Sequence, residues 1–139
     1  MPQPQIEEKP MIHHIVRMKP KADVTPEQID EVLACLREQG RVIPAVTSFT
    51  VGREHGTGFD FGAVFVIEDL DGYWEYLIHP AHTHTDRVGL PLAERIETYD
   101  VSDDEDPDFG PRIAALHHRR YAADPELAAL VAALPAAGR

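Results

Sequence analysis

Hydrophobic and polar residues alternate along residues 11–19, a pattern that predicts a β-strand with one buried face. The predicted buried face carries Ile12, His14, Val16 and Met18. Since His14 falls among apolar residues, it is either a core histidine with a satisfied hydrogen bond or part of the wall of a pocket.

A helix is predicted to begin after Thr25. Thr25 can cap it, Pro26 suits its first position, and Gln28 completes a capping box. We expect it to end at Gly40. Between these points one apolar stripe repeats at helical spacing and consists of Ile29, Val32, Leu33 and Leu36.

Two more strands are predicted, over residues 44–51 and 60–68. In the first, strict alternation sets Val46, Ser48 and Thr50 against Thr47, Phe49 and Val51. The second strand is apolar on both faces, which indicates a sheet covered on two sides. The chain's own helices would cover one side, and a partner subunit is a candidate for the other.

Residues 69–78 predict a short helix, and residues 80–95 predict a second helix with an irregularity near 89–91. Residues 96–102 predict a last strand, on which Thr98 and Asp100 share a face. The order β-α-β-β-α-α-β predicts an α+β fold with the helices on one face of the sheet.

Three segments lie outside this pattern. Residues 1–10 are proline-rich and polar and predict a flexible arm. Residues 103–110 form an acidic linker, and residues 111–139 a helical extension, so the main domain spans residues 11–102. The extension carries an apolar stripe that needs a surface on its own domain or on a second subunit: Leu127, Leu130, Val131 and Leu134.

Composition narrows the classes of function. The chain has 139 residues, with 24 acidic against 13 basic residues and a net charge of −11, so nucleic acid and anionic membranes are not expected partners. Cys35 is the single cysteine, which excludes an intramolecular disulfide and a cysteine-rich zinc site. We see no secretory signal or membrane span and expect a cytoplasmic protein.

The densest candidate chemistry lies in residues 76–82, which read Tyr-Leu-Ile-His-Pro-Ala-His. Pro80 ends one helix and suits the first turn of the next, which places His82 near a helix N-terminus. The positive end of the helix dipole disfavours imidazolium there, so His82 is a candidate general base. The alternative is structural, with His82 capping the helix and Tyr76 packing in the core.

His79, His82 and His84, with Asp86 as a carboxylate, offer enough ligands for a zinc ion. Because Pro80 interrupts the helix and His84 points away from His82, we expect no metal. No histidine is set apart as a haem ligand. The cluster at residues 117–120, His-His-Arg-Arg, is expected to be a solvated helix face or internally paired.

Four segments in this order resemble the stress-responsive A/B barrel family, Dabb: the strand from Ile12, the helix after Thr25, residues 43–52 and residues 76–82. The resemblance covers about residues 11–102. It implies a ferredoxin-like β-α-β-β-α-β subunit and a homodimer, the dimeric α+β barrel, with a cavity for a small-molecule ligand.

One plant member of this family is a cofactor-free polyketide cyclase, and residues 76–82 are similar to its catalytic segment. The resemblance implies that His82 is the acid/base, that Tyr76 orients the substrate carbonyl, and that His14 and Asp100 contact the substrate. Phe61 stands where that enzyme has another histidine, and with His79 it completes the expected substrate-binding set.

The expected function is therefore small-molecule binding, with cofactor-independent cyclase, lyase or isomerase chemistry on a polyketide-like or aromatic substrate. The alternative is a non-catalytic stress-responsive or scaffold protein. A cavity that is open and lined by His14, Tyr76, His82 and Asp100 would favour chemistry. A cavity plugged by the C-terminal helices would favour the scaffold.

Overall fold

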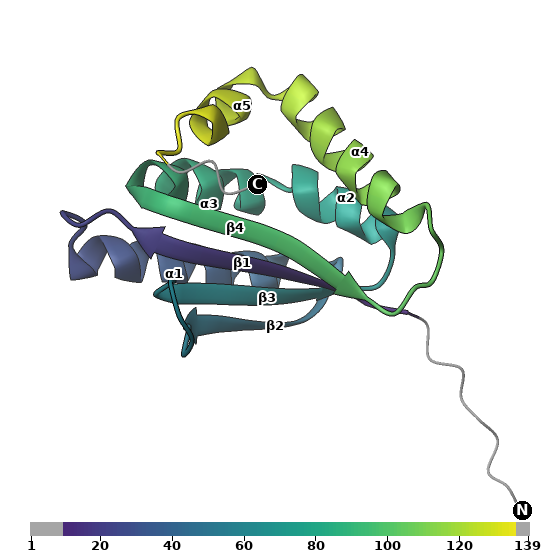
Figure 1. The fold of residues 1–139 in the computed structure, drawn as a ribbon, viewed down its shortest axis with the longest axis horizontal. Helices are drawn as coiled ribbons and strands as arrows, with labels where there is room; N and C mark the ends of the chain where they lie inside the picture. The colour runs from purple at the N-terminus through teal and green to yellow at the C-terminus, as the bar shows by residue number, and fades with distance from the viewer. Residues whose placement is uncertain (1–9, 136–139) are drawn as a thin grey trace, which may run out of the picture.

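A computed structural model describes residues 10–135, and the arm expected at residues 1–10 lies almost wholly outside them. The elements follow the predicted order and continue into two C-terminal helices (Figure 1). Their bounds are β1 Ile12–Pro20, α1 Pro26–Val42, β2 Val46–Arg53, β3 Phe61–Ile67, α2 Leu70–Ile78, α3 Pro80–Gly89, the 3-10 helix η1 Leu90–Leu92, β4 Ala93–Ser102, α4 Phe109–Ala123 and α5 Pro125–Ala132.

The four strands form one antiparallel sheet in the order β2-β3-β1-β4. Strands β1 and β4, the first and last of the family-like segment, lie side by side, and His14 is directly opposite Asp100. The ferredoxin-like α+β prediction is confirmed.

Helices α1, α2 and α3 lie on one face of the sheet (Figure 1). The main core lies between the two layers, and its largest fully buried side chains include Phe65, Tyr73 and Tyr76. On β3, Ala63, Phe65 and Ile67 face this core. The valines at 64 and 66 alternate with them, so they point to the face that the chain's own helices leave uncovered.

Local sequence explains where the helices start. Thr25 and Gln28 form the expected capping box at α1, with both reciprocal hydrogen bonds present. Asp69 caps α2 by accepting from the Gly72 N–H. At α3 the capping residue is His79, whose Nδ1 accepts from the Ala81 N–H at 3.1 Å, with Pro80 at the first helical position.

Three local predictions were wrong. Helix α1 continues past Gly40 to Val42, because Gly40 is needed for packing: a Cβ there would lie 2.4 Å from the Phe49 ring. Strict alternation fails in β2, where the register shifts between Val46 and Ser48, so that Val46, Phe49 and Val51 all contact the core. The helix predicted over residues 80–95 ends at Gly89, since Pro91 and the turn of η1 lead straight into β4.

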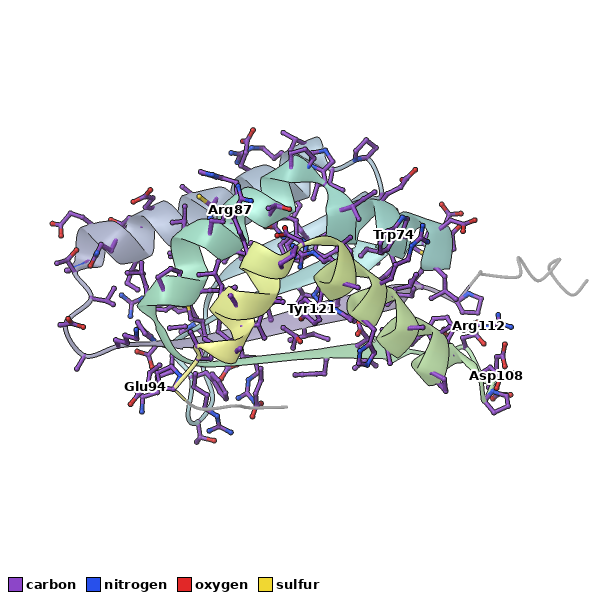
Figure 2. All side chains as sticks on the ribbon, turned by 90° about the horizontal axis from the view of Figure 1, so that it is seen from above. Trp74, Arg87, Glu94, Asp108, Arg112 and Tyr121 are labelled. Carbon is purple, nitrogen blue, oxygen red and sulfur yellow. The ribbon has the colours of Figure 1, made fainter. Side chains whose placement is uncertain are left out.

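The C-terminal helices fold back on their own domain. Helix α4 contacts α2, and α5 contacts α3 and η1, so the two form an arch that follows β4 when seen from above (Figures 1 and 2). Ile113 of α4 is part of the main core, and Leu127 of α5 is 2% exposed. The apolar stripe therefore packs within the subunit: Leu127 is buried, and Leu130, Val131 and Leu134 are partly buried. Within residues 10–135, no helix has the length and apolar character needed to cross a membrane.

Candidate functional site

The site begins with a pair of strand residues. His14 of β1 and Asp100 of β4 are register partners on the helix-facing side of the sheet, and His14 Nδ1 lies 2.8 Å from Asp100 Oδ1. His14 is 2% exposed. Because an ionised carboxylate can only accept, we assign His14 Nδ1 as the donor.

Helices α2 and α4 extend this pair into a network. The Tyr73 hydroxyl lies 3.0 Å from Asp100 Oδ2 and donates to it. Its oxygen is 2.8 Å from His117 Nε2 and can accept from that nitrogen. Burial first, and then the Asp100 charge, hold the pKa of Tyr73 far above its usual range, so the phenol stays protonated.

A second, adjacent group contains the two residues expected to be catalytic. The Tyr76 and His82 rings stack, with centroids 4.4 Å apart and an interplanar angle of 27°. The Tyr76 hydroxyl accepts from Gln39 Nε2 at 2.8 Å. His14 joins the two groups, because its ring packs edge-on against Tyr76 with centroids 5.3 Å apart.

His82 is neutral at physiological pH. Burial, opposed by the Asp86 carboxylate, lowers the pKa of His82 to about 4. Position in the first turn of a helix was the expected reason for neutrality, whereas removal from water is the leading cause in the structure. His82 Nδ1 lies 3.2 Å from the Leu77 carbonyl oxygen, to which the neutral ring can donate, and this leaves Nε2 with its lone pair.

Arg120 of α4 forms an ion pair with Asp86, the carboxylate next to His82. Its Nη2 lies 2.7 Å from Asp86 Oδ2, and His82 Nε2 lies 3.5 Å from the same oxygen. The Arg120 guanidinium also helps to lower the pKa of His82. In the basic cluster at residues 117–120, the side chains of His117 and Arg120 therefore point inward. The guanidinium carbon of Arg119 lies 4.2 Å from the centroid of the Trp74 ring.

Small cavities adjoin these groups. One of about 90 Å³ is bordered by His14, His82 and His117, and it is also lined by Leu127 and Val131 of α5 and by Leu134 just beyond that helix. Another of about 50 Å³ is lined by Gln39, Tyr76, His82 and others. Gln39 Oε1 is buried and has no hydrogen-bond partner among the described residues. An unpartnered buried acceptor costs about 1–3 kcal/mol, which a ligand donor could recover.

Two residues of the expected site lie elsewhere. Phe61 pairs with Met18 near one end of β3 and lines neither of the cavities that His82 lines. His79 uses its ring to cap α3. Among residues 10–135, no cluster of three or more histidine, cysteine or acidic side chains could hold a metal ion. The structure brings together His14, Tyr76, His82 and Asp100.

Four further side chains of the site were not among the residues expected there from the sequence: Tyr73, Gln39, His117 and Arg120. Tyr73 lies one turn before Tyr76 on the same helix, so its i, i+3 spacing was a usable signal. His117 had a weaker signal, as a polar residue on the apolar stripe of its helix. Gln39 had none, because a single glutamine in a helix looks like a surface residue.

The sequence model of the stress responsive A/B barrel domain, Dabb, matches residues 12–103. The chain belongs to this family. Helices α4 and α5 lie beyond the matched segment, so His117 and Arg120 are additions to the Dabb domain. No curated protein matches the chain in sequence.

Solved structures share the fold at low identity. A dimeric ferredoxin-like protein of unknown function from Thermobifida fusca is 23% identical, with a TM-score of 0.62. The match covers 68% of this chain and 92% of the Thermobifida fusca chain. A hydroxynitrile lyase from Passiflora edulis is 17% identical, with a TM-score of 0.63, covering 70% and 97%. A cofactor-independent oxygenase from Streptomyces nogalater is 17% identical, with a TM-score of 0.55, covering 70% and 97%.

Proposed function

We propose that this Dabb protein binds a small molecule at its helix–sheet site and carries out cofactor-independent cyclase, lyase or isomerase chemistry on a polyketide-like or aromatic substrate. The observation that carries the proposal is the His82–Tyr76 pair. A buried, neutral imidazole is stacked on a buried phenol, and both line one cavity.

The two rings can divide an aldol-type or related proton transfer between them. His82 Nε2 takes the proton from a carbon next to a carbonyl, since Nδ1 is held by the Leu77 carbonyl. The Tyr76 oxygen already accepts from Gln39, so its own proton is available to the carbonyl oxygen on which negative charge develops. Burial raises the pKa of Tyr76 well above its usual range, which keeps that proton in place.

The residues around this pair would orient the substrate. His14 packs against the edge of Tyr76 and is held by Asp100, so its ring position is fixed from two sides. Gln39 Oε1 offers an acceptor for a substrate hydroxyl. Phe61 and His79 remain expected substrate-binding residues from the family likeness, and their positions give this expectation no support.

The test is turnover of a substrate panel by the purified protein. The panel pairs linear poly-β-ketone thioesters with aromatic cyanohydrins, the latter because a structurally similar chain is a hydroxynitrile lyase. We expect His82→Gln to lower the rate by about 10²–10⁴-fold, the usual contribution of a general base. His84→Gln, an exposed residue of the same helix, is the matched control and should leave the rate unchanged.

A full rate in the His82→Gln variant would contradict the role of His82, and no acceleration by the wild-type protein on any member of the panel would contradict the enzyme proposal. The alternative, a non-catalytic scaffold, draws on one observation. The C-terminal helices line the cavity of about 90 Å³, and the cavity beside it measures only about 50 Å³.

We also propose that the subunit forms a homodimer through the outer face of its sheet. Tyr99 and Val101 are 46% and 54% exposed there, and they lie opposite Ile15 and His13 of β1, respectively. Together with Val64 and Val66 they make an apolar surface opposite the helices. The proposal is supported by the description of solved relatives, such as the Thermobifida fusca protein, as dimeric.

A further inference from the structure

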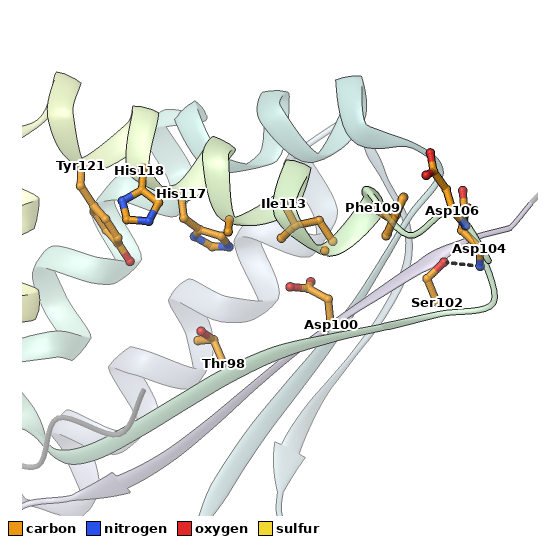
Figure 3. A pocket seen from close by; sticks show the side chains of 12 residues that line it. Thr98, Asp100, Ser102, Asp104, Asp106, Phe109, Ile113, His117, His118 and Tyr121 are labelled. Carbon is orange, nitrogen blue, oxygen red and sulfur yellow. Dashed lines mark hydrogen bonds between the residues drawn. The ribbon is translucent and has the colours of Figure 1, made fainter.

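A groove of about 580 Å³ runs between β4 and α4 (Figure 3). Side chains of β4 form its floor, side chains of α4 its opposite wall, and the loop between them closes one end. Its lining consists of Thr98, Asp100, Ser102, Asp104, Asp106, Phe109, Gly110, Ile113, Ala114, His117, His118 and Tyr121.

This groove exists because of the C-terminal extension. The whole α4 wall lies beyond residue 103, where the match to the Dabb domain ends. The floor is the helix-facing side of β4, so the groove lies opposite the sheet face proposed for dimerisation. A ligand in it would therefore meet a surface that the matched domain does not contain.

The groove and the inner cavity share a wall. Thr98, His117 and Tyr121 line both the groove and the cavity of about 90 Å³ that borders His82. Small-molecule sites usually measure about 300–1,000 Å³, so the groove is large enough for a whole ligand, whereas the inner cavity could take only one end of it. A molecule bound in the groove would end against His117, which contacts the Tyr73–Asp100–His14 network.

The lining selects by polarity and charge. Phe109, Ile113 and Ala114 present apolar surface from α4, while Thr98 and Ser102 present hydroxyls from β4. Asp100, which already accepts from His14 and Tyr73, and Asp104 and Asp106 add three carboxylates, and the lining has two histidines but no lysine or arginine. Arg112 comes within 3.8 Å of Asp106, but both side chains are exposed, so the pair offsets little of the negative potential.

We propose that this groove binds an amphipathic small molecule with an apolar body, hydrogen-bond donors and no negative charge. The apolar body lies along α4, and the donors face the carboxylates and hydroxyls of β4 and the linker. This proposal rests on the proposed function in one respect: the bound molecule would be the substrate that reaches the site past His117. It excludes carboxylates, phosphates and sulfonates as ligands.

The test uses two fluorescent probes with the same ring frame. N-phenyl-1-naphthylamine is uncharged, and 8-anilino-1-naphthalenesulfonate adds one sulfonate. We expect the uncharged probe to bind the full-length protein at least ten times more tightly. Ala114→Trp, which fills the groove, should abolish that binding, while Ala115→Trp, the next residue on α4 and not part of the lining, should preserve it.

A second arm tests the charge and does not depend on the tryptophan variants. Asp104→Asn with Asp106→Asn should strengthen sulfonate-probe binding severalfold and leave the uncharged probe unchanged. Absence of uncharged-probe binding, equal affinities for both probes, or equal effects of the two tryptophan variants would each overturn the proposal. His82→Gln should leave probe binding intact, so a failure here is distinct from a failure of the proposed chemistry.

Discussion

His82 is neutral because it is buried, and two charged neighbours act on it in opposite directions. Asp86 favours the imidazolium and Arg120 disfavours it, and these two side chains are themselves paired at 2.7 Å. The result is an uncharged ring beside a cavity, with a lone pair on Nε2, which lies 3.5 Å from Asp86 Oδ2. The charge state of His82 is therefore set by its burial and by the Asp86–Arg120 ion pair next to it.

We expect folding stability to depend on His82 as the pH falls. The pKa of His82 is about 4 in the folded state and 6.5 in the unfolded state, so below pH 6.5 the unfolded state binds more protons. The contribution of His82 to the free energy of unfolding is fully present above pH 6.5 and is lost as the pH falls towards 4. The loss amounts to about 2 kcal/mol between roughly pH 7.5 and 5.

Urea unfolding of the wild type and of His82→Gln at both pH values measures this loss, because contributions from other groups cancel in the difference. An identical pH dependence in the two proteins would show that His82 titrates normally in the folded state.

Arg120→Gln should raise the pKa of His82. Removing the guanidinium removes a positive charge that disfavours imidazolium and leaves Asp86 free to stabilise it. An NMR titration of the His82 ring measures the shift. Arg119→Gln, on the same helix but stacked over Trp74, is the control. An unchanged or lower pKa of His82 in Arg120→Gln would refute the tuning role.

At the scale of elements, the ends of helices follow local chemistry and their interiors follow packing. The Thr25 capping box and Pro80 set helix starts as the sequence predicted. Gly40 did not end α1, because the ring of Phe49 from β2 occupies the space where a side chain would stand. The neighbouring strand therefore decides whether a glycine ends a helix or allows a side chain of that strand to pack against the helix.

Gly40→Ala should destabilise the protein by about 1–3 kcal/mol, since the new methyl group would overlap the Phe49 ring and the cost of overpacking exceeds the gain in helix propensity. Gly110→Ala, on α4 with nothing within 4 Å of the added Cβ, should be neutral or slightly stabilising. Denaturant midpoints of both variants measure the difference. Equal midpoints would contradict the packing role of Gly40.

For the whole molecule, the two faces of the sheet have different partners. The inner face meets helices of the same chain, and α4 and α5 add a second layer that closes the site from the side of β4 (Figure 2). The outer face keeps exposed apolar side chains on β4 that no described helix covers. This asymmetry is the structural basis for the proposed homodimer.

Val101→Glu combined with Val66→Glu should convert the homodimer to a monomer, because a charge on each of two strands would have to be desolvated in the interface. Light scattering after gel filtration measures the mass. Ile78→Glu, at a 51% exposed residue of α2 away from the sheet, is the matched control and should remain dimeric. A double variant of dimeric mass would place the interface elsewhere.

Sequence patterns alone predict the order of elements, the capped helix starts, the face of β1 that carries His14, and the family-like segment at residues 76–82. These are local properties, set by periodicity over a few residues and by the chemistry of proline, threonine and aspartate. The folded arrangement is needed to identify four further side chains of the site, because each comes from a helix whose position depends on long-range packing: Tyr73, Gln39, His117 and Arg120. The depressed pKa of His82 is tertiary as well, because burial is a property of the assembled layers and not of the seven residues that carry the histidine.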